Sequence, residues 1–177
     1  MRTLRSGRPT PTAMRPLLLA ALTLTLAACD SVGDDWPFPG AEIDADAGAE
    51  VADAEALAAL RAEWVADPPA GYWLRYETVC FCTPTVTDVR VIGGEIVEAR
   101  INGEAPPEDP AFEAFTVLGL YDQAIVAYRD ADAALARVRS GAPPLLVSLA
   151  IDRTGEIADD EVAYRVLAYA PLTVATD

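Results

Sequence analysis

The spacing of apolar residues predicts two helices separated by strands. The first run recurs every three or four positions and consists of Leu57, Leu60, Trp64 and Val65. The pattern changes at Val51, and this spacing places the four side chains on one face of a helix. The helix is expected to end at Asp67, because the residue before a proline disfavours helical backbone.

Strict alternation follows this helix and predicts a strand over residues 72–82. Its apolar face is expected to carry Tyr72, Leu74, Tyr76, Thr78, Cys80 and Cys82. Residues 86–92 and 95–102 flank Gly93-Gly94 and predict a hairpin. A three-residue turn with Gly94 in the left-handed region places Thr87, Val89, Val91, Val97, Ala99 and Ile101 together. In that register Arg90, Glu98 and Arg100 face water.

A second helical stripe begins after Thr116, which is expected to be the N-cap. The stripe consists of Val117, Leu120, Tyr121, Ala124, Ile125 and Tyr128. The helix either breaks near Asp130 or continues through Leu135 and Val138. Alternation in residues 145–151 and 162–168 predicts the last two strands. The tyrosines on these stripes are expected to pack in the core: Tyr72, Tyr76, Tyr121, Tyr128 and Tyr164.

This order of elements predicts an α+β fold over residues 51–177, in the order α-β-β-β-α-β-β. Short loops between neighbouring strands favour antiparallel pairing. We therefore expect two amphipathic helices on one face of an antiparallel sheet of five to six strands.

Residues 1–28 are typical of a lipoprotein signal peptide. Four arginines precede a short apolar stretch over residues 17–28, and Cys29 follows directly. The stretch is too short to span a bilayer. Leu26-Ala27-Ala28-Cys29 is similar to a bacterial lipobox, which implies that Cys29 carries lipid and anchors the chain in the membrane. Either Met1 or Met14 is the start, since residues 14–28 form a complete short signal.

Residues 29–50 are expected to form the lipidated Cys29 and an acidic, flexible tether. Residues 30–50 contain seven acidic residues, with no helical or strand period. The alternative is that Trp36 and Phe38 dock on the domain.

Several short motifs occur in a fixed order: Tyr72-Trp73-Leu74-Arg75-Tyr76, Cys80-Phe81-Cys82, Val89-Arg90-Val91 with Gly94, Thr116-Val117 with Leu120-Tyr121, Ile151-Asp152-Arg153, and residues 158–162 with Tyr164. Together they resemble the bacterial family called domain of unknown function 6174, over residues 57–169. The resemblance implies an envelope lipoprotein and no established activity. Residues 140–144 depart from a Gly-Tyr-Pro stretch found in many such proteins.

Composition narrows the function further. The net charge of −15 argues against binding of nucleic acid, because a protein that binds phosphate groups needs a basic face. The chain has no histidine, which removes the usual general base, the triads that depend on it and most zinc sites. No phosphate loop, dinucleotide motif or zinc-protease motif occurs, so we expect neither an enzyme nor a bound cofactor.

Cys80 and Cys82 are the only thiols left once Cys29 is lipidated. On a regular strand their α-carbons are roughly 6.5–7 Å apart, which is near the upper limit for a disulfide. Three interpretations stay open: a structural disulfide, two buried reduced thiols, or a redox or soft-metal site.

Asp152, Asp159, Asp160 and Glu161 form the weaker candidate site. Together with Glu156 they offer oxygen ligands to calcium, although their spacing is not that of an EF-hand. Acidic residues in turns more often cap the local backbone or face water.

These observations predict a lipid-anchored protein of the bacterial cell envelope, either periplasmic or surface-exposed. The leading hypothesis is a non-catalytic module that binds another envelope protein. The alternatives are a thiol-disulfide module that uses Cys80 and Cys82, and an acidic calcium-binding module.

Overall fold

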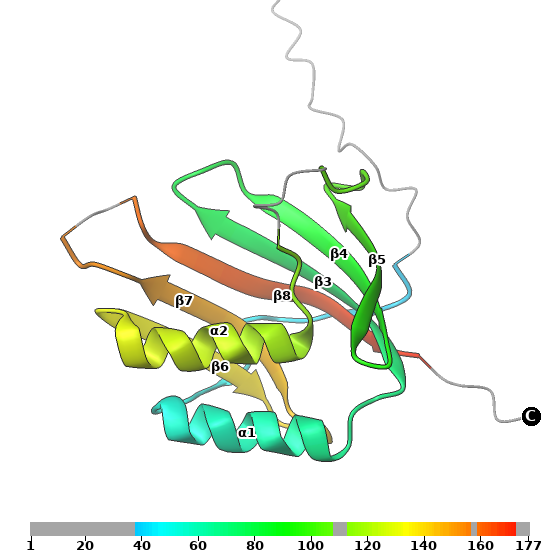
Figure 1. Ribbon diagram of the computed structural model, residues 1–177, viewed down its shortest axis with the longest axis horizontal. Coiled ribbons are helices and arrows are strands. Elements are labelled where there is room, and N and C mark those ends of the chain that lie inside the picture. The colour runs from blue at the N-terminus through cyan, green and yellow to red at the C-terminus, as the bar shows by residue number, and fades with distance from the viewer. Residues whose placement is uncertain (1–37, 108–112, 157–158, 173–177) are drawn as a thin grey trace, which may run out of the picture. The chain divides into compact units, whose positions relative to one another are not determined.

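The computed structural model describes residues 38–107, 113–156 and 159–172 (Figure 1). The predicted signal peptide, Cys29 and Trp36 lie outside them. The described elements are β1 (Ala41–Glu42), β2 (Ala49–Glu50), α1 (Ala54–Ala66), β3 (Gly71–Cys80), β4 (Thr85–Ile92), β5 (Glu95–Ile101), α2 (Val117–Asp130), β6 (Ala133–Arg139), β7 (Leu145–Asp152) and β8 (Val162–Pro171). Neither helix in the described part of the chain is long and apolar enough to cross a membrane.

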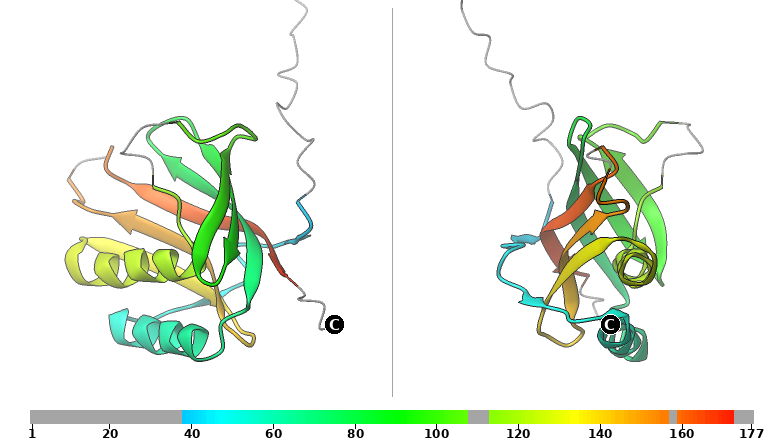
Figure 2. Two further views of the ribbon diagram at one scale, coloured as in Figure 1. Left: turned by 45° about the vertical axis from the view of Figure 1, so that its right-hand side comes forward. Right: turned by 90° about the vertical axis from the view of Figure 1, so that its left-hand side faces the viewer.

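The strands form one antiparallel sheet, which confirms the α+β class but has more strands than expected. Its order is β2-β6-β7-β8-β3-β4-β5, and β1 also pairs with β8. Both helices lie on the same side of this sheet (Figure 2). Helix α2 packs on β6 and β7, and α1 packs beside α2. The opposite side of the sheet is called the outer face below.

Helix α1 begins after Asp53, whose carboxylate accepts a hydrogen bond from the backbone N–H of Ala56 at 2.8 Å. Val51 lies before the helix, and its N–H donates to the carbonyl of Ala136. Leu57 and Trp64 are buried, as expected. Val65 is 50% exposed, because its position on the helix points away from the side that packs.

Helix α2 is capped by Thr116, which confirms the predicted N-terminus. Two tyrosines of β3 add to this cap: the hydroxyl of Tyr76 accepts from the N–H of Phe115 at 2.9 Å, and that of Tyr72 from Val117 at 3.1 Å. The phenol of Tyr72 satisfies a helix-end donor that otherwise lacks a partner, and that of Tyr76 holds the residue just before the N-cap. Packing and capping therefore use the same aromatic side chains.

The suggested continuation of α2 through Leu135 and Val138 is wrong. The backbone of Ala131 is extended, and residues 133–139 form β6, which pairs with β7. Ala, Leu and Arg are good helix formers, so the local propensity favours a helix here. Hydrogen bonding to a neighbouring strand overrides this weak preference.

Strands β4 and β5 pair in the predicted register at the end far from the turn, but the turn itself differs from the prediction. Gly93 and Gly94 both have positive φ, at 60° and 87°, and form a two-residue turn between Ile92 and Glu95. The extra residue is in a bulge beside Arg90, beyond which Val89 pairs with Ala99. Val97, predicted to be on the buried face, is 55% exposed.

The N-terminal segment differs from the tether expected over residues 29–50. Residues 41–50 contain β1 and β2, which pair with β8 and β6. Ile43 is buried, and its N–H donates to the carbonyl of Leu167 at 2.8 Å. Phe38 contacts the ring of Trp73, as the docking alternative expected. Part of this acidic segment therefore covers the outer face.

Tyrosine burial predicts a loss of stability at alkaline pH. Desolvation raises the pKa of Tyr169 from its usual value of 10.0 to about 12, and raises those of Tyr72, Tyr76, Tyr121 and Tyr164 as well. Above pH about 10 the unfolded chain releases these protons while the folded chain keeps them. The free energy of unfolding therefore falls as pH rises from about 10 to about 12.

Urea unfolding measured across this pH range checks the expectation. Tyr169→Phe removes one of the titrating groups, so its stability should fall less steeply than that of the parent protein. An identical slope for the variant and the parent would contradict the assignment.

Candidate functional site

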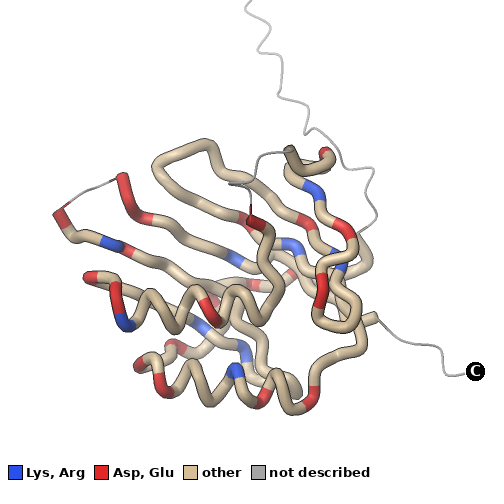
Figure 3. Tube along the Cα trace, viewed as in Figure 1, with Lys and Arg blue, Asp and Glu red and all other residues tan. Residues whose placement is uncertain are grey.

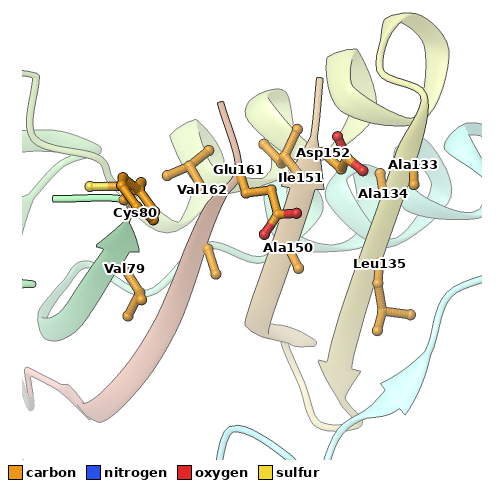
Figure 4. Close-up of a pocket in the computed structure, with 12 residues that line it drawn as sticks. Val79, Cys80, Ala133, Ala134, Leu135, Ala150, Ile151, Asp152, Glu161 and Val162 are labelled. Carbon is orange, nitrogen blue, oxygen red and sulfur yellow. The ribbon is translucent and has the colours of Figure 1, made fainter. Parts of the chain in front are cut away.

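An apolar groove crosses the outer face of the sheet at the end where β3 finishes (Figure 4). It encloses about 360 Å³ and is lined by residues of four adjacent strands and their ends: Val79, Cys80, Phe81, Ala133, Ala134, Leu135, Ala150, Ile151, Asp152, Glu161, Val162 and Ala163. This groove is called the outer groove below. Sequence patterns did not indicate it, because its lining comes from strands that are distant in the chain.

The floor of the outer groove is a row of directly paired residues. Val79 pairs with Ala163, Ala163 with Ala150, and Ala150 with Leu135. In Figure 4, Val79, Ala150 and Leu135 point to the same side of their strands. Small alanines at the centre, between a larger valine and leucine at the ends, leave a concave surface.

The rim of the outer groove combines an exposed aromatic ring with acidic groups. Phe81 is a large apolar side chain and is 82% exposed. Asp152 and Glu161 lie among the lining residues, and the buried Oδ1 of Asp152 has no hydrogen-bond partner in the described structure. Acidic residues also occur on both helices and around the β7–β8 connection (Figure 3).

Cys80 and Cys82 lie beside this rim with their sulfur atoms in direct contact. Their α-carbons are 5.0 Å apart, closer than in a regular strand, because β3 ends at Cys80 and the chain bends at Phe81. The predicted position of Cys82 on the strand was therefore wrong. Cys80 is half-buried and Cys82 is exposed. This arrangement fits a disulfide and contradicts two buried thiols.

The acidic candidates for calcium do not converge on one point. Thr154 donates its hydroxyl to Asp160 Oδ2, and the N–H of Gly155 donates to Asp132 Oδ2 at 2.8 Å. Asp159 and Glu161 are exposed. Among the described residues, no group of three or more histidine, cysteine or acidic side chains is placed to hold a metal. The acidic side chains that make these bonds organise the turn.

The tyrosine stripes do not form a ligand groove. Tyr72, Tyr76 and Tyr121 are buried, and the hydroxyl of Tyr121 donates to the carbonyl of Pro144 at 3.2 Å. Tyr128 donates to the carbonyl of Val51 and accepts from the N–H of Ala136. These contacts agree with the predicted packing role.

A cluster of charged and aromatic side chains covers another part of the outer face. Arg75 donates two hydrogen bonds to Asp88, at 2.6 and 3.1 Å, and Asp88 is only 3% exposed. The Arg75 guanidinium lies 4.8 Å from the ring of Phe38, and that of Arg90 lies 5.6 Å from the ring of Trp73. The sequence pattern did not predict this ion pair. It also predicted that Arg90 faces water, whereas Arg90 is half-buried and lies over the ring of Trp73. Only the register, in which Arg75 and Asp88 are directly paired, indicates the contact.

Comparison with known proteins gives one match. A family model described as a family of unknown function, DUF6174, matches residues 56–171, which is more than half of the chain. No curated protein and no solved structure matches.

Proposed function

Given that the chain belongs to DUF6174, a family of unknown function, we propose that it is a lipid-anchored, non-catalytic interaction module of the bacterial cell envelope. Its partner is an amphipathic helix of another envelope protein, which binds in the outer groove. The observation that carries this proposal is the uncovered apolar row across β3, β8, β7 and β6.

The pairing of these four strands favours a helix as the partner. Their backbone groups are already hydrogen-bonded to one another, so an extended peptide gains no main-chain bonds by lying on the floor. A helix satisfies its own backbone and needs only an apolar surface. The row crosses three inter-strand spacings, or about 14 Å, which matches about ten residues of helix.

The charge of the partner follows from the rim and from the whole chain. Asp152 and Glu161 line the outer groove, and the net charge is −15. A helix with basic residues on the flank beside these carboxylates is attracted, whereas an acidic helix is repelled. We therefore assign a basic amphipathic helix.

The anchor is the lipid on Cys29, supported by the arginines, the apolar stretch and the lipobox-like residues before it. An acidic chain is not attracted to anionic lipid surfaces, so covalent lipid is the means of attachment. Mass spectrometry of the protein from bacterial membranes tests this. Acyl groups on an N-terminal Cys29 are expected, and an unprocessed, acyl-free chain would contradict the anchor.

Binding is tested with a synthetic basic amphipathic peptide of about 18 residues, long enough to form a helix. Ala150→Arg places a large charged side chain on the exposed centre of the floor, and we expect it to weaken binding at least tenfold, or by about 1.4 kcal/mol. The matched control is Val97→Arg, at an exposed bulge on β5, which should not change the affinity.

A charge-reversed peptide, with glutamate in place of lysine, completes the experiment. It should bind at least tenfold more weakly than the basic peptide to the parent protein. Equal affinity of the basic peptide for the parent and Ala150→Arg, measured by calorimetry, would exclude the outer groove as its site. Tighter binding of the acidic peptide would exclude the assigned charge.

A further inference from the structure

We propose that Cys80 and Cys82 form a transferable disulfide, which the protein donates to a pair of thiols on another envelope protein. This activity goes beyond helix binding and rests on separate observations. Three observations support it: the contact between the two sulfurs, the different exposure of the two cysteines, and their position where β3 ends.

The small loop closed by these cysteines argues against a purely structural role. The two residues are separated by one position, so the disulfide closes a loop of three residues. A disulfide stabilises a fold mainly by restricting the unfolded chain, and this effect is smaller for a shorter loop. A large apolar core on the helix side of the sheet already holds β3 in place through Tyr72, Leu74 and Tyr76.

The exposure of the two residues determines which sulfur reacts. An incoming thiolate must approach along the line of the sulfur-sulfur bond and needs access to the sulfur that it attacks. Cys82 is exposed beyond the end of the strand, whereas Cys80 is half-buried and belongs to β3. The structure therefore assigns Cys82 as the attacked sulfur and Cys80 as the leaving group.

The exchange balances in two steps. A partner thiol loses its proton and attacks Cys82 Sγ, which breaks the Cys80–Cys82 bond, forms a mixed disulfide and releases Cys80 as a thiolate that takes up a proton. The second partner thiol then attacks the partner sulfur of the mixed disulfide. Cys82 leaves as a thiolate and is protonated. The partner is oxidised by two electrons, and Cys80 and Cys82 are reduced to thiols.

The test uses the full chain with Cys29→Ser, so that Cys80 and Cys82 are its only cysteines, and a reduced peptide with two cysteines as the probe. The oxidised protein should convert about one equivalent of peptide to its disulfide and gain two free thiols. The matched control also carries Cys80→Ser and Cys82→Ser. Peptide oxidation no faster with the parent than with this control would overturn the proposal.

Single variants test the assignment of the two sulfurs. With Cys80→Ser, the free Cys82 should react with oxidised glutathione and form a stable mixed disulfide. With Cys82→Ser, the half-buried Cys80 should react roughly tenfold more slowly. Equal rates, or the reverse order, would overturn Cys82 as the attacked sulfur.

The melting temperature distinguishes this activity from a structural role. The control without Cys80 and Cys82 should melt only a few degrees below the parent, because the loop is short. A control that is unfolded at room temperature would show a structural bridge and overturn the proposal. Cys80 is one of the residues that line the outer groove, but none of these measurements involves a bound helix. Failure of disulfide transfer therefore leaves helix binding untouched, and the reverse also holds.

Discussion

Trp64→Ala is expected to lower the free energy of unfolding by about 4 kcal/mol, the largest effect of any single substitution proposed for this protein. Trp64 is 2% exposed and is the largest fully buried side chain in the described structure. Its ring packs edge-on against Tyr72 and Tyr169, with centroids 5.8 and 6.2 Å away. Alanine removes these contacts and leaves a cavity where α1 meets the sheet.

Val65→Ala is the matched control, because Val65 is the next residue on the same helix and is 50% exposed. Alanine is also the better helix former, so its stability should stay within about 0.5 kcal/mol of the parent. Urea unfolding measures both variants. It is followed by circular dichroism and not by tryptophan fluorescence, because one variant lacks Trp64. Similar losses for the two variants would show that the packed face of α1 has been misidentified.

Asp88→Ala is expected to cost about 3 kcal/mol. Asp88 is almost completely buried and accepts both of its hydrogen bonds from Arg75. Removing one partner of a buried ion pair leaves the other charge without compensation. The Arg75 side chain is 31% exposed, so water recovers part of this cost, and the value lies at the lower end of the range for buried pairs.

Asp122→Ala provides the comparison, because it breaks an ion pair of the same geometry on the surface. Asp122 accepts two hydrogen bonds from Arg61, and the two side chains are 55% and 36% exposed. Such pairs contribute at most about 1 kcal/mol. Denaturant unfolding should therefore separate the two variants clearly. Equal losses would contradict the special role of burial at Asp88.

The sequence predicts the elements whose hydrophobic period is strong and uninterrupted. The stripe from Val117 to Tyr128 and the N-cap Thr116 give α2 its correct start, and the alternation of Tyr72, Leu74 and Tyr76 gives the buried face of β3. Each of these patterns depends on residues close together in the chain. Local spacing is therefore sufficient to locate them.

Features that depend on distant pairing could not be predicted in the same way. Strand β6 has helix-forming residues and becomes a strand only because β7 lies beside it. The position of the hairpin bulge, which exposes Val97, follows from the packing of Ile96 against the core. Phe38 docks on the outer face because it contacts Trp73 and Arg75 there.

The same distinction between local patterns and distant pairing applies to the candidate site. The sequence singled out Cys80 and Cys82, because two cysteines separated by one residue are conspicuous in a chain with so few. It did not predict the outer groove, whose floor joins Val79, Ala150 and Leu135 from three parts of the chain. Those residues are unremarkable until the strand order is known.

The outer groove is tested most directly by locating a bound helix on the protein with NMR. Addition of the basic amphipathic peptide should shift the methyl resonances of the floor residues Val79, Leu135, Ala150 and Ala163. The methyl resonances of Val97 and Val126, which are exposed elsewhere, should not move. Shifts centred on Val97 or Val126, or no shifts at the floor when the peptide is in excess, would contradict a helix-binding groove.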